Sequence, residues 1–195
     1  MRPFFVYLRM PFSYFLVYKP FGVLSQFTTP LEGKVGLGSL YDFPKDVYPV
    51  GRLDEDSEGL LLLTNDGSAN RRLLGQGIEK TYWVQVEGSI SDANLDPLRK
   101  GLTIKVNKVL YHTLPARAKV LEGAPALPER NPPVRFRANI PTSWIEVVLR
   151  EGKNRQVRKM TAAIGFPTLR LVRVRFGKLD LGKLQPGEVR PIQVF

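Results

Sequence analysis

The stretch GRLDEDSEGLLLLTNDG, residues 51–67, sets five carboxylates around a run of four leucines. Residues 60–64 predict a buried strand, because a short continuous apolar run bounded by turn residues is typical of a strand in a protein core. The Asn-Asp-Gly sequence that follows predicts the turn that ends this strand. Ser68 is then expected to cap a short helix over residues 69–74, which Gly75 ends. The stretch therefore predicts a core strand that begins at an acidic turn.

Other segments also have the periodicity of strands. In KTYWVQVEG, residues 80–88, Tyr82, Val84 and Val86 fall on one face, and Trp83 and Gln85 fall on the other. Further strands are predicted over 13–18, 142–149 and 168–176.

Helical spacing is seen in NRQVRKMTAAIG, residues 154–165, where Val157, Met160 and Ile164 form one apolar stripe. A second helix is expected over residues 91–101, with Ser91 as its N-cap and Pro97 inside it. Because predicted strands outnumber predicted helices, the fold class is α+β, with a large mixed or antiparallel sheet.

The composition limits the chemistry. The chain has 195 residues, with 29 Lys and Arg against 18 Asp and Glu, and a net charge of +11. This excess indicates a polyanionic partner, most often a nucleic acid. There is no cysteine, which excludes disulfides, thiolate nucleophiles and Cys-ligated zinc. The one histidine, His112, is interpreted as a structural or surface residue. Any chemistry must therefore use carboxylates, Tyr, Lys, Arg or hydroxyl groups.

The first 14 residues are interpreted as an N-terminal leader, followed by one domain over residues 15–195. Charges and prolines interrupt the apolar leader, so that it is too short to span a membrane, and no small-residue cleavage site follows it. A cytoplasmic protein is therefore expected.

Opposite charges gather in two distant segments. Residues 51–66 hold five acids and one base, whereas residues 150–175 hold eight bases and one acid. A fold that joins them could place an ionised carboxylate beside an arginine in a basic cleft that holds phosphates. The residues alone leave two alternatives open: a solvated charged helix with an acidic turn, or a divalent-metal site at Asp54 and Asp56.

The motifs GRLDEDSEGLLLLTNDG, KTYWVQVEG and EGKNRQVRKM occur in the order found in pseudouridine synthases of the RsuA branch, which the chain resembles. YKPFGVLSQF, RNPPVRFRANIPTSW and GFPTLRLVRV are most similar to the RluE-type enzymes, which modify large-subunit ribosomal RNA. The resemblance covers residues 15–190. It implies a mainly antiparallel mixed sheet of about eight strands, with flanking helices and loops and an active-site cleft across it. Many members of the branch begin with a small S4-type RNA-binding domain, but the residues before Phe15 are too few to hold one, so no S4 domain is expected.

The resemblance assigns roles to three residues. Asp54 of GRLD corresponds to the catalytic carboxylate, Tyr82 to the tyrosine that stacks on the target base, and Arg158 to the arginine that pairs with the catalytic acid. Arg52 belongs to the first motif, and Lys153 and Arg155 depart from the histidine-containing pattern common among relatives. The residues expected to contact RNA are Arg52, Lys153, Arg155, Lys159, Arg170, Arg173 and Arg175.

The implied reaction is an isomerisation in which the uracil N1–C1′ bond breaks and C5 bonds to C1′. It needs no redox step or energy source, so neither a cofactor nor a metal is expected. Asp54 could attack C1′ or remove the C2′ proton. Two other functions remain alternatives: a non-catalytic basic protein that binds ribosomal RNA, and a metal-dependent nuclease. A monomer is expected, because no long apolar surface helix is found in the sequence.

Overall fold

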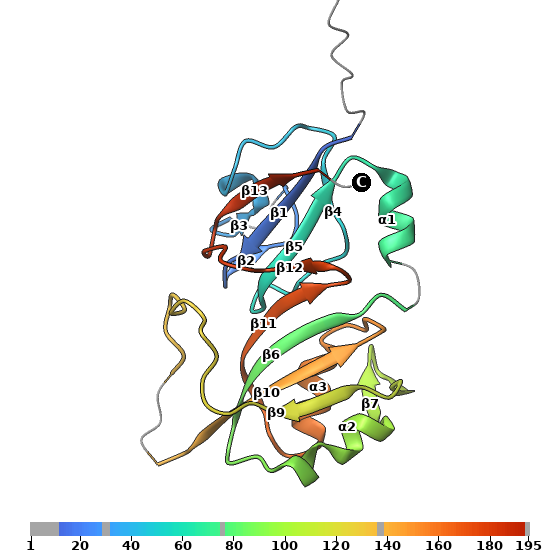
Figure 1. The fold of residues 1–195 in the computed structure, drawn as a ribbon, viewed down its shortest axis with the longest axis vertical. Helices are drawn as coiled ribbons and strands as arrows, with labels where there is room; N and C mark the ends of the chain where they lie inside the picture. The colour runs from blue at the N-terminus through green and yellow to red at the C-terminus, as the bar shows by residue number, and fades with distance from the viewer. Residues whose placement is uncertain (1–11, 29–31, 75–76, 136–138, 194–195) are drawn as a thin grey trace, which may run out of the picture.

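A mixed nine-stranded sheet forms the centre of the molecule (Figure 1). The computed structural model describes residues 12–28, 32–74, 77–135 and 139–193. The strands of this sheet are β1 (Tyr14–Lys19), β4 (Tyr48–Pro49), β5 (Glu58–Thr64), β6 (Lys80–Glu87), β9 (Arg117–Val120), β10 (Thr142–Leu149), β11 (Thr168–Phe176), β12 (Leu179–Asp180) and β13 (Val189–Ile192). Their order is β13-β1-β5-β11-β6-β10-β9, with β4 beside β5 and β12 beside β11.

The sheet is mainly antiparallel, as predicted, and the described residues supply nine strands to it where about eight were expected. Strand β5 runs parallel to β11, with Glu58 opposite Val172 and Gly59 opposite Arg173. This short pairing joins the strands β13-β1-β5 to the strands β11-β6-β10-β9. Gly59 has φ +105°, and a Cβ there would lie 2.3 Å from the Arg173 carbonyl oxygen. The two halves therefore meet where only glycine allows the backbones to approach so closely.

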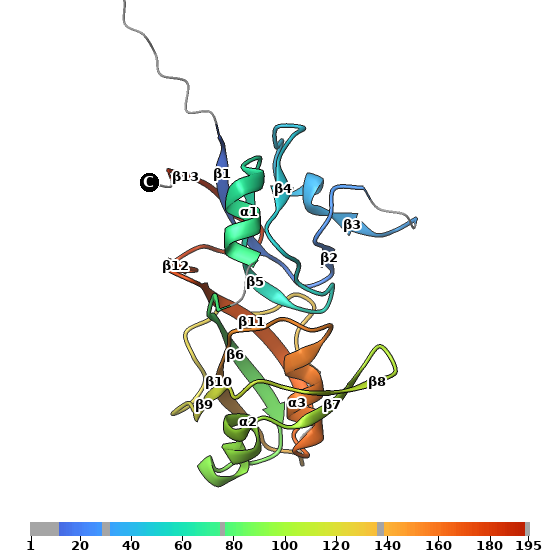
Figure 2. The same ribbon diagram turned by 90° about the vertical axis from the view of Figure 1, so that its right-hand side faces the viewer.

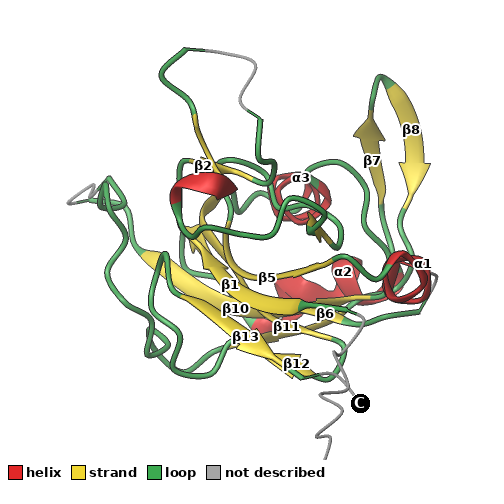
Figure 3. Ribbon diagram, turned by 90° about the horizontal axis from the view of Figure 1, so that it is seen from above, coloured by secondary structure: helices red, strands yellow, loops and turns green. Residues whose placement is uncertain are grey.

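Smaller elements surround the sheet. They are α1 (Gly67–Leu74), α2 (Asp96–Lys100), α3 (Gln156–Ala163), the 3₁₀ turns η1 (Leu37–Ser39) and η2 (Asp92–Leu95), and the two-stranded pairs β2 (Val23–Leu24) with β3 (Val35–Gly36) and β7 (Thr103–Val106) with β8 (Val109–His112). Helix α3 and the β2–β3 and β7–β8 pairs lie on one side of the sheet (Figures 2 and 3). This side is the one that carries the candidate active site.

The leucine run is apolar throughout because β5 is buried on both faces. Leu60 and Leu62 pack in one cluster with Tyr18, whereas Leu61 and Leu63 pack in another. On β6 the predicted alternation is confirmed, since Tyr82, Val84 and Val86 are buried and the residues between them are partly exposed. The predicted strands over 13–18, 142–149 and 168–176 and the helix at 154–165 are also present.

Two local predictions need correction. Helix α1 is capped by Asp66, whose Oδ1 accepts hydrogen bonds from the backbone N–H groups of Ser68 and Ala69, so Ser68 is not the cap. The single helix expected over residues 91–101 is a 3₁₀ turn followed by α2, with Pro97 in the first turn of α2, where its missing N–H costs no hydrogen bond. Gly75 and residues 1–11 of the expected leader lie outside the described residues. No helix in the described part of the chain is long and apolar enough to cross a membrane.

Candidate active site

A cavity of about 350 Å³ lies between the acidic turn before β5, the strands β6 and β11, and the segment that leads into α3. Asp54, Tyr82 and Arg155 all line it. The carboxylate comes from one half of the sheet, and the tyrosine comes from the other. The fold therefore brings together the two oppositely charged segments, which is one of the arrangements that the charge pattern left open.

Buried polar groups fix the turn that carries Asp54. The Ser25 hydroxyl donates to the Leu53 carbonyl at 2.8 Å and accepts from the Leu53 N–H at 3.0 Å. Lys19 is fully buried, and its Nζ donates to the carbonyls of Pro20, Val23 and Glu55. Burial lowers the pKa of Lys19 to about 8. These contacts tie the turn to the β1–β2 connection, and sequence reasoning missed them because nothing in the charge pattern singles out Lys19 or Ser25.

Asp54 lies in the first position of a turn that the Ser57 N–H closes by donating to the Asp54 carbonyl at 3.0 Å. Its side chain is 34% exposed, so the carboxylate can be reached from the cavity. Arg155 is its partner of opposite charge, and the two side chains are separated by 4.0 Å between Arg155 Nη1 and Asp54 Oδ2. The turn thus presents a carboxylate whose contact with Arg155 is longer than a hydrogen bond.

Asp56, two residues later, binds the arginines instead. Arg155 donates to both of its oxygens, at 2.9 and 2.7 Å. Arg158 Nε lies 3.4 Å from Asp56 Oδ2, and Arg158 Nη2 donates to the Asp56 carbonyl at 2.6 Å. Partial burial raises the pKa of Asp56, but the hydrogen bonds from Arg155 and the charges of both arginines outweigh it and hold that pKa below its ordinary value. The structure brings Arg158 to the acidic turn but pairs it with Asp56, so a direct Arg158–Asp54 ion pair stays a prediction.

Tyr82 and Arg173 are neighbours on adjacent strands, and both side chains point to the same side of the sheet. They are opposite residues in the β6–β11 register, and both line the cavity. The Arg173 side chain is buried, and its Nε donates to the Leu60 carbonyl at 2.8 Å. Its Nη2 has no hydrogen-bond partner among the described residues. The tyrosine ring therefore lies beside a buried guanidinium at the back of the cavity.

Basic side chains lie at the mouth of the cavity. Arg52, Lys153 and Arg155 are exposed and line it. Lys159 lies one turn along α3, where its Nζ donates to the Asn154 carbonyl at 2.8 Å. These four predicted RNA contacts lie on the Asp54 side of the sheet.

The three arginines of β11 were expected to contact RNA, but none of them lies where RNA would meet this cavity. Arg170 is buried and makes two 2.9 Å hydrogen bonds with Glu58, and Arg173 is buried as described above. Arg175 is exposed but lies opposite Thr81, on the other face of β6 from Tyr82, and pairs with Asp180. The register shift between Arg173 and Arg175 places them on opposite faces. None of the three is at the mouth of the cavity.

Glu151 is a further site residue that the sequence did not reveal. It accepts hydrogen bonds from the Tyr111 hydroxyl, from the Leu114 N–H at 2.9 Å and from Gln156 Nε2 at 2.5 Å. It thereby links the base of the β7–β8 hairpin to the start of α3. The sequence does single out Glu151 in one respect, since it is the one acid among the eight bases of residues 150–175.

The site can support a reaction in which the Asp54 carboxylate acts on a substrate held against the Tyr82 ring, because both side chains line the cavity. Among the residues that the structure describes, no group of three or more acidic or histidine side chains is arranged to hold a metal ion. Both oxygens of Asp56 are already bound by Arg155, whereas Asp54 is the acid of this turn that lines the cavity. His112 lies exposed on β8 with its Nδ1 3.2 Å from the Thr103 hydroxyl.

The sequence profile of the RNA pseudouridylate synthase family matches residues 13–163, which include Asp54, Tyr82 and Arg158. The chain belongs to this family. It is therefore an enzyme of the isomerase class, and its fold is that of the family.

Individual proteins similar to this chain support its assignment to the family. "Ribosomal large subunit pseudouridine synthase E" of Vibrio parahaemolyticus is 53% identical over 178 residues, 90% of this chain and 72% of that protein. The protein of the same name from Xanthomonas campestris pv. campestris is 48% identical, over 90% of this chain and 92% of that one. A crystal structure described as a pseudouridylate synthase superposes with a TM-score of 0.75 and 26% identity, over 93% of this chain and 70% of that chain.

Proposed function

We propose that the protein converts one uridine of large-subunit ribosomal RNA to pseudouridine, and that Asp54 is the catalytic carboxylate. The single observation that supports this best is that Asp54 and Tyr82, from the two halves of the sheet, line one cavity with basic residues at its mouth. The substrate is proposed from the names of the relatives, which are large-subunit enzymes. Action on ribosomal RNA implies a cytoplasmic location.

The target uridine must leave the RNA stack to reach the cavity, at a cost of a few kcal/mol. Tyr82 offsets part of this cost by stacking on the base, which is worth about 1–3 kcal/mol for comparable contacts. Arg52, Lys153, Arg155 and Lys159 contact backbone phosphates and position the strand.

Asp54 acts as an anion at the sugar. It attacks C1′ or removes the C2′ proton, and in both routes the N1–C1′ bond breaks and the uracil turns before C5 bonds to C1′. Arg155 and Arg158 place positive charge close to the acidic turn. As C5 bonds to C1′, the bond between Asp54 and C1′ breaks, or the proton taken from C2′ returns. C5 then loses its proton and N1 gains one, and the Tyr82 hydroxyl relays this transfer by giving up its own proton as it takes the one from C5.

The test is the replacement Asp54→Asn, with Glu55→Gln as the matched control in the same turn. Glu55 pairs with Lys34 at the surface, where both side chains are 39% exposed. We expect Asp54→Asn to abolish pseudouridine formation in a ribosomal RNA fragment while the affinity for that RNA stays unchanged. Glu55→Gln should keep full activity.

Two results would contradict the proposal. Pseudouridine formation by the Asp54→Asn variant would show that Asp54 is not the catalytic carboxylate. Absence of activity in the wild-type protein, with RNA binding intact, would favour the non-catalytic RNA-binding alternative. Product formation in excess chelator would exclude the metal-dependent nuclease.

A further inference from the structure

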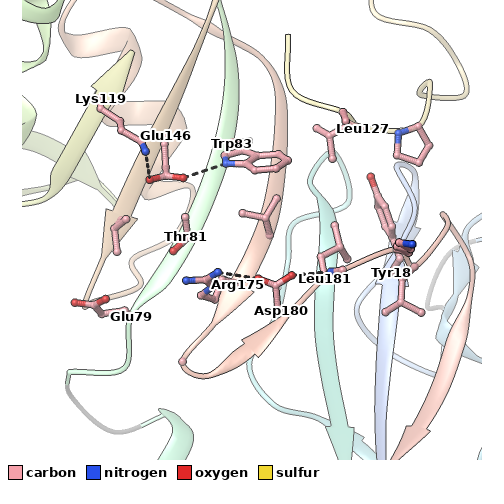
Figure 4. A pocket seen from close by; sticks show the side chains of 18 of the residues that line it. Tyr18, Glu79, Thr81, Trp83, Lys119, Leu127, Glu146, Arg175, Asp180 and Leu181 are labelled. Carbon is pink, nitrogen blue, oxygen red and sulfur yellow. Dashed lines mark hydrogen bonds and ion pairs between the residues drawn. The ribbon is translucent and has the colours of Figure 1, made fainter. Parts of the chain in front are cut away.

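A second cavity, of about 710 Å³, lies on the face of the sheet opposite Asp54 (Figure 4). Successive residues of β6 point to opposite faces, so Tyr82 lines the catalytic cavity and Trp83 lines this one. Its volume falls in the range of cavities that hold small organic groups. The proposed chemistry uses none of its lining residues.

Trp83 gives this cavity a flat aromatic wall in a fixed orientation. Its Nε1 donates to Glu146 Oε2 at 3.1 Å, and Lys119 Nζ lies 3.4 Å from the other oxygen of Glu146. Figure 4 shows the indole directed from β6 toward the space below Leu127. Trp144, the other tryptophan of the chain, lies on the same face, since its partner in the sheet is Gln85. Both tryptophans are therefore on the face away from Asp54.

The charged residues around the cavity largely neutralise one another. Arg117 makes two hydrogen bonds with Glu79, at 2.9 and 2.7 Å, and Arg175 pairs with Asp180 at 2.9 Å. A charged ligand would have to compete with these pairs, whereas a flat uncharged group would leave them intact. The lining therefore favours an aromatic heterocycle over a phosphate.

Tyr18 supplies a polar group on the wall across from Trp83. It is fully buried, it lines the cavity, and its hydroxyl donates no hydrogen bond within the described part of the chain, since its charged neighbour Arg170 can only act as a donor to it. Figure 4 shows the hydroxyl directed toward the Leu127 side of the cavity. Burial, followed by the nearby charge of Glu58, raises the pKa of Tyr18 to about 12 against a smaller opposing effect of Arg170, so the hydroxyl keeps its proton at neutral pH. A buried hydroxyl whose proton has no acceptor is rare.

We propose that this second cavity binds an unstacked nucleobase outside the target uridine, with Trp83 as the stacking surface and the Tyr18 hydroxyl as the hydrogen-bond donor. The proposal rests on RNA being the substrate, as proposed above, and adds a contact on the far face of the same sheet. A sheet face that stacks bases on aromatic side chains is a known mode of single-stranded RNA recognition. The chemistry of the cavity identifies the ligand as a base, which either RNA or a free nucleoside can supply.

Fluorescence of Trp83 tests the contact directly. In a Trp144→Phe variant Trp83 is the only tryptophan, and oligoadenylate, which holds no uridine, should quench it. Free adenosine is the second ligand: quenching by both supports the cavity as a base site, and tighter binding of the oligonucleotide identifies RNA as the source. If neither oligoadenylate nor free adenosine quenches Trp83, the proposal is wrong.

Binding of labelled oligoadenylate by variants gives an independent readout. Trp83→Ala should weaken binding about tenfold or more, the loss expected for one base–aromatic stack. Trp83→Tyr keeps a flat ring and should retain most of the affinity, which guards against a folding defect in the alanine variant. Tyr48→Ala, an exposed aromatic outside both cavities, is the control and should change nothing. Unchanged binding by folded Trp83→Ala would contradict the proposal.

The two proposals fail separately. In the wild-type protein, pseudouridine formation on a short stem-loop that carries the target uridine reports on the proposed function, whereas quenching of Trp83 in the Trp144→Phe variant reports on the second cavity. Wild-type protein that forms pseudouridine but shows no Trp83 response would leave the proposed function standing and remove only this second site.

Discussion

At the scale of single residues, Asp54 and Asp56 lie in the same acidic turn but make different contacts. Asp56 takes two hydrogen bonds from Arg155 and one close contact from Arg158, whereas Asp54 keeps a partly exposed carboxylate that faces the cavity. The family resemblance predicted that an arginine would meet this turn, whereas the pattern of charges alone left this open. That pattern could not show which acid the arginine would bind, because two residues of the same turn differ only in the direction of their side chains.

Lys19 provides a pH-dependent test of how the turn is held. Its pKa is about 8 in the folded protein, against 10.5 for an ordinary lysine, because of burial. Between these two values the unfolded chain binds more protons than the folded one, so this residue makes the folded state more stable as pH rises from about 8 to 10.5. The gain is at most about 3 kcal/mol.

The measurement is urea unfolding of the wild type and of Lys19→Met at about pH 7 and about pH 10, on either side of the folded-state pKa. The free energy of unfolding of the wild type, minus that of the variant, should increase at the higher pH. A difference that stays constant or falls would show that Lys19 has no lowered pKa in the folded protein.

At the scale of elements, the segments with a clear period were predictable and the pairing between them was not. The alternation in β6 and the stripe of α3 appear as predicted, since each buries one face. Strand β11 is buried on both faces over most of its length, so its pattern does not reveal where its arginines point. The register shift before Arg175 and the parallel contact with β5 depend on partners far away in sequence, which local periodicity cannot supply.

Gly59 is the element-scale test of that parallel contact. An alanine there would place its Cβ 2.3 Å from the Arg173 carbonyl oxygen at φ +105°, and backbone on both strands would have to move. We expect Gly59→Ala to lower the free energy of unfolding by about 3 kcal/mol or more.

Gly67→Ala is the matched control, because the methyl group that it adds would meet no atom of the described residues within 4 Å, and the backbone there is helical. It should raise stability by up to about 1 kcal/mol. Thermal or urea unfolding that gives similar values for both variants would refute the close approach of β5 and β11.

At the scale of the whole molecule, the junction between β5 and β11 aligns the active site. Asp54 precedes β5 in one half of the sheet, whereas Tyr82 and Arg158 belong to the other. The buried Glu58–Arg170 pair and the Arg173–Leu60 hydrogen bond cross this junction. The Glu58 carboxylate, one of the five acids of residues 51–67, thus joins the two halves.

The substitution Glu58→Gln tests this contact between the two halves of the sheet. It leaves the Arg170 guanidinium buried without its counter-ion, so we expect a loss of about 3 kcal/mol in the free energy of unfolding. Asp180→Asn breaks the exposed Arg175 pair and should cost less than about 1 kcal/mol. Equal losses in the two variants, measured by urea unfolding, would mean that the buried pair does not hold the halves together.

The function proposed for the whole molecule is the isomerisation, by Asp54, of a uridine in large-subunit ribosomal RNA. Its sharpest test maps pseudouridine at every position of that RNA from cells without the protein, after complementation with the wild type, Asp54→Asn or Glu55→Gln. We predict one pseudouridine that is lost without the protein, restored by the wild type and by Glu55→Gln, and not restored by Asp54→Asn. An unchanged map without the protein, or restoration of the site by Asp54→Asn, would show that the proposed function is wrong.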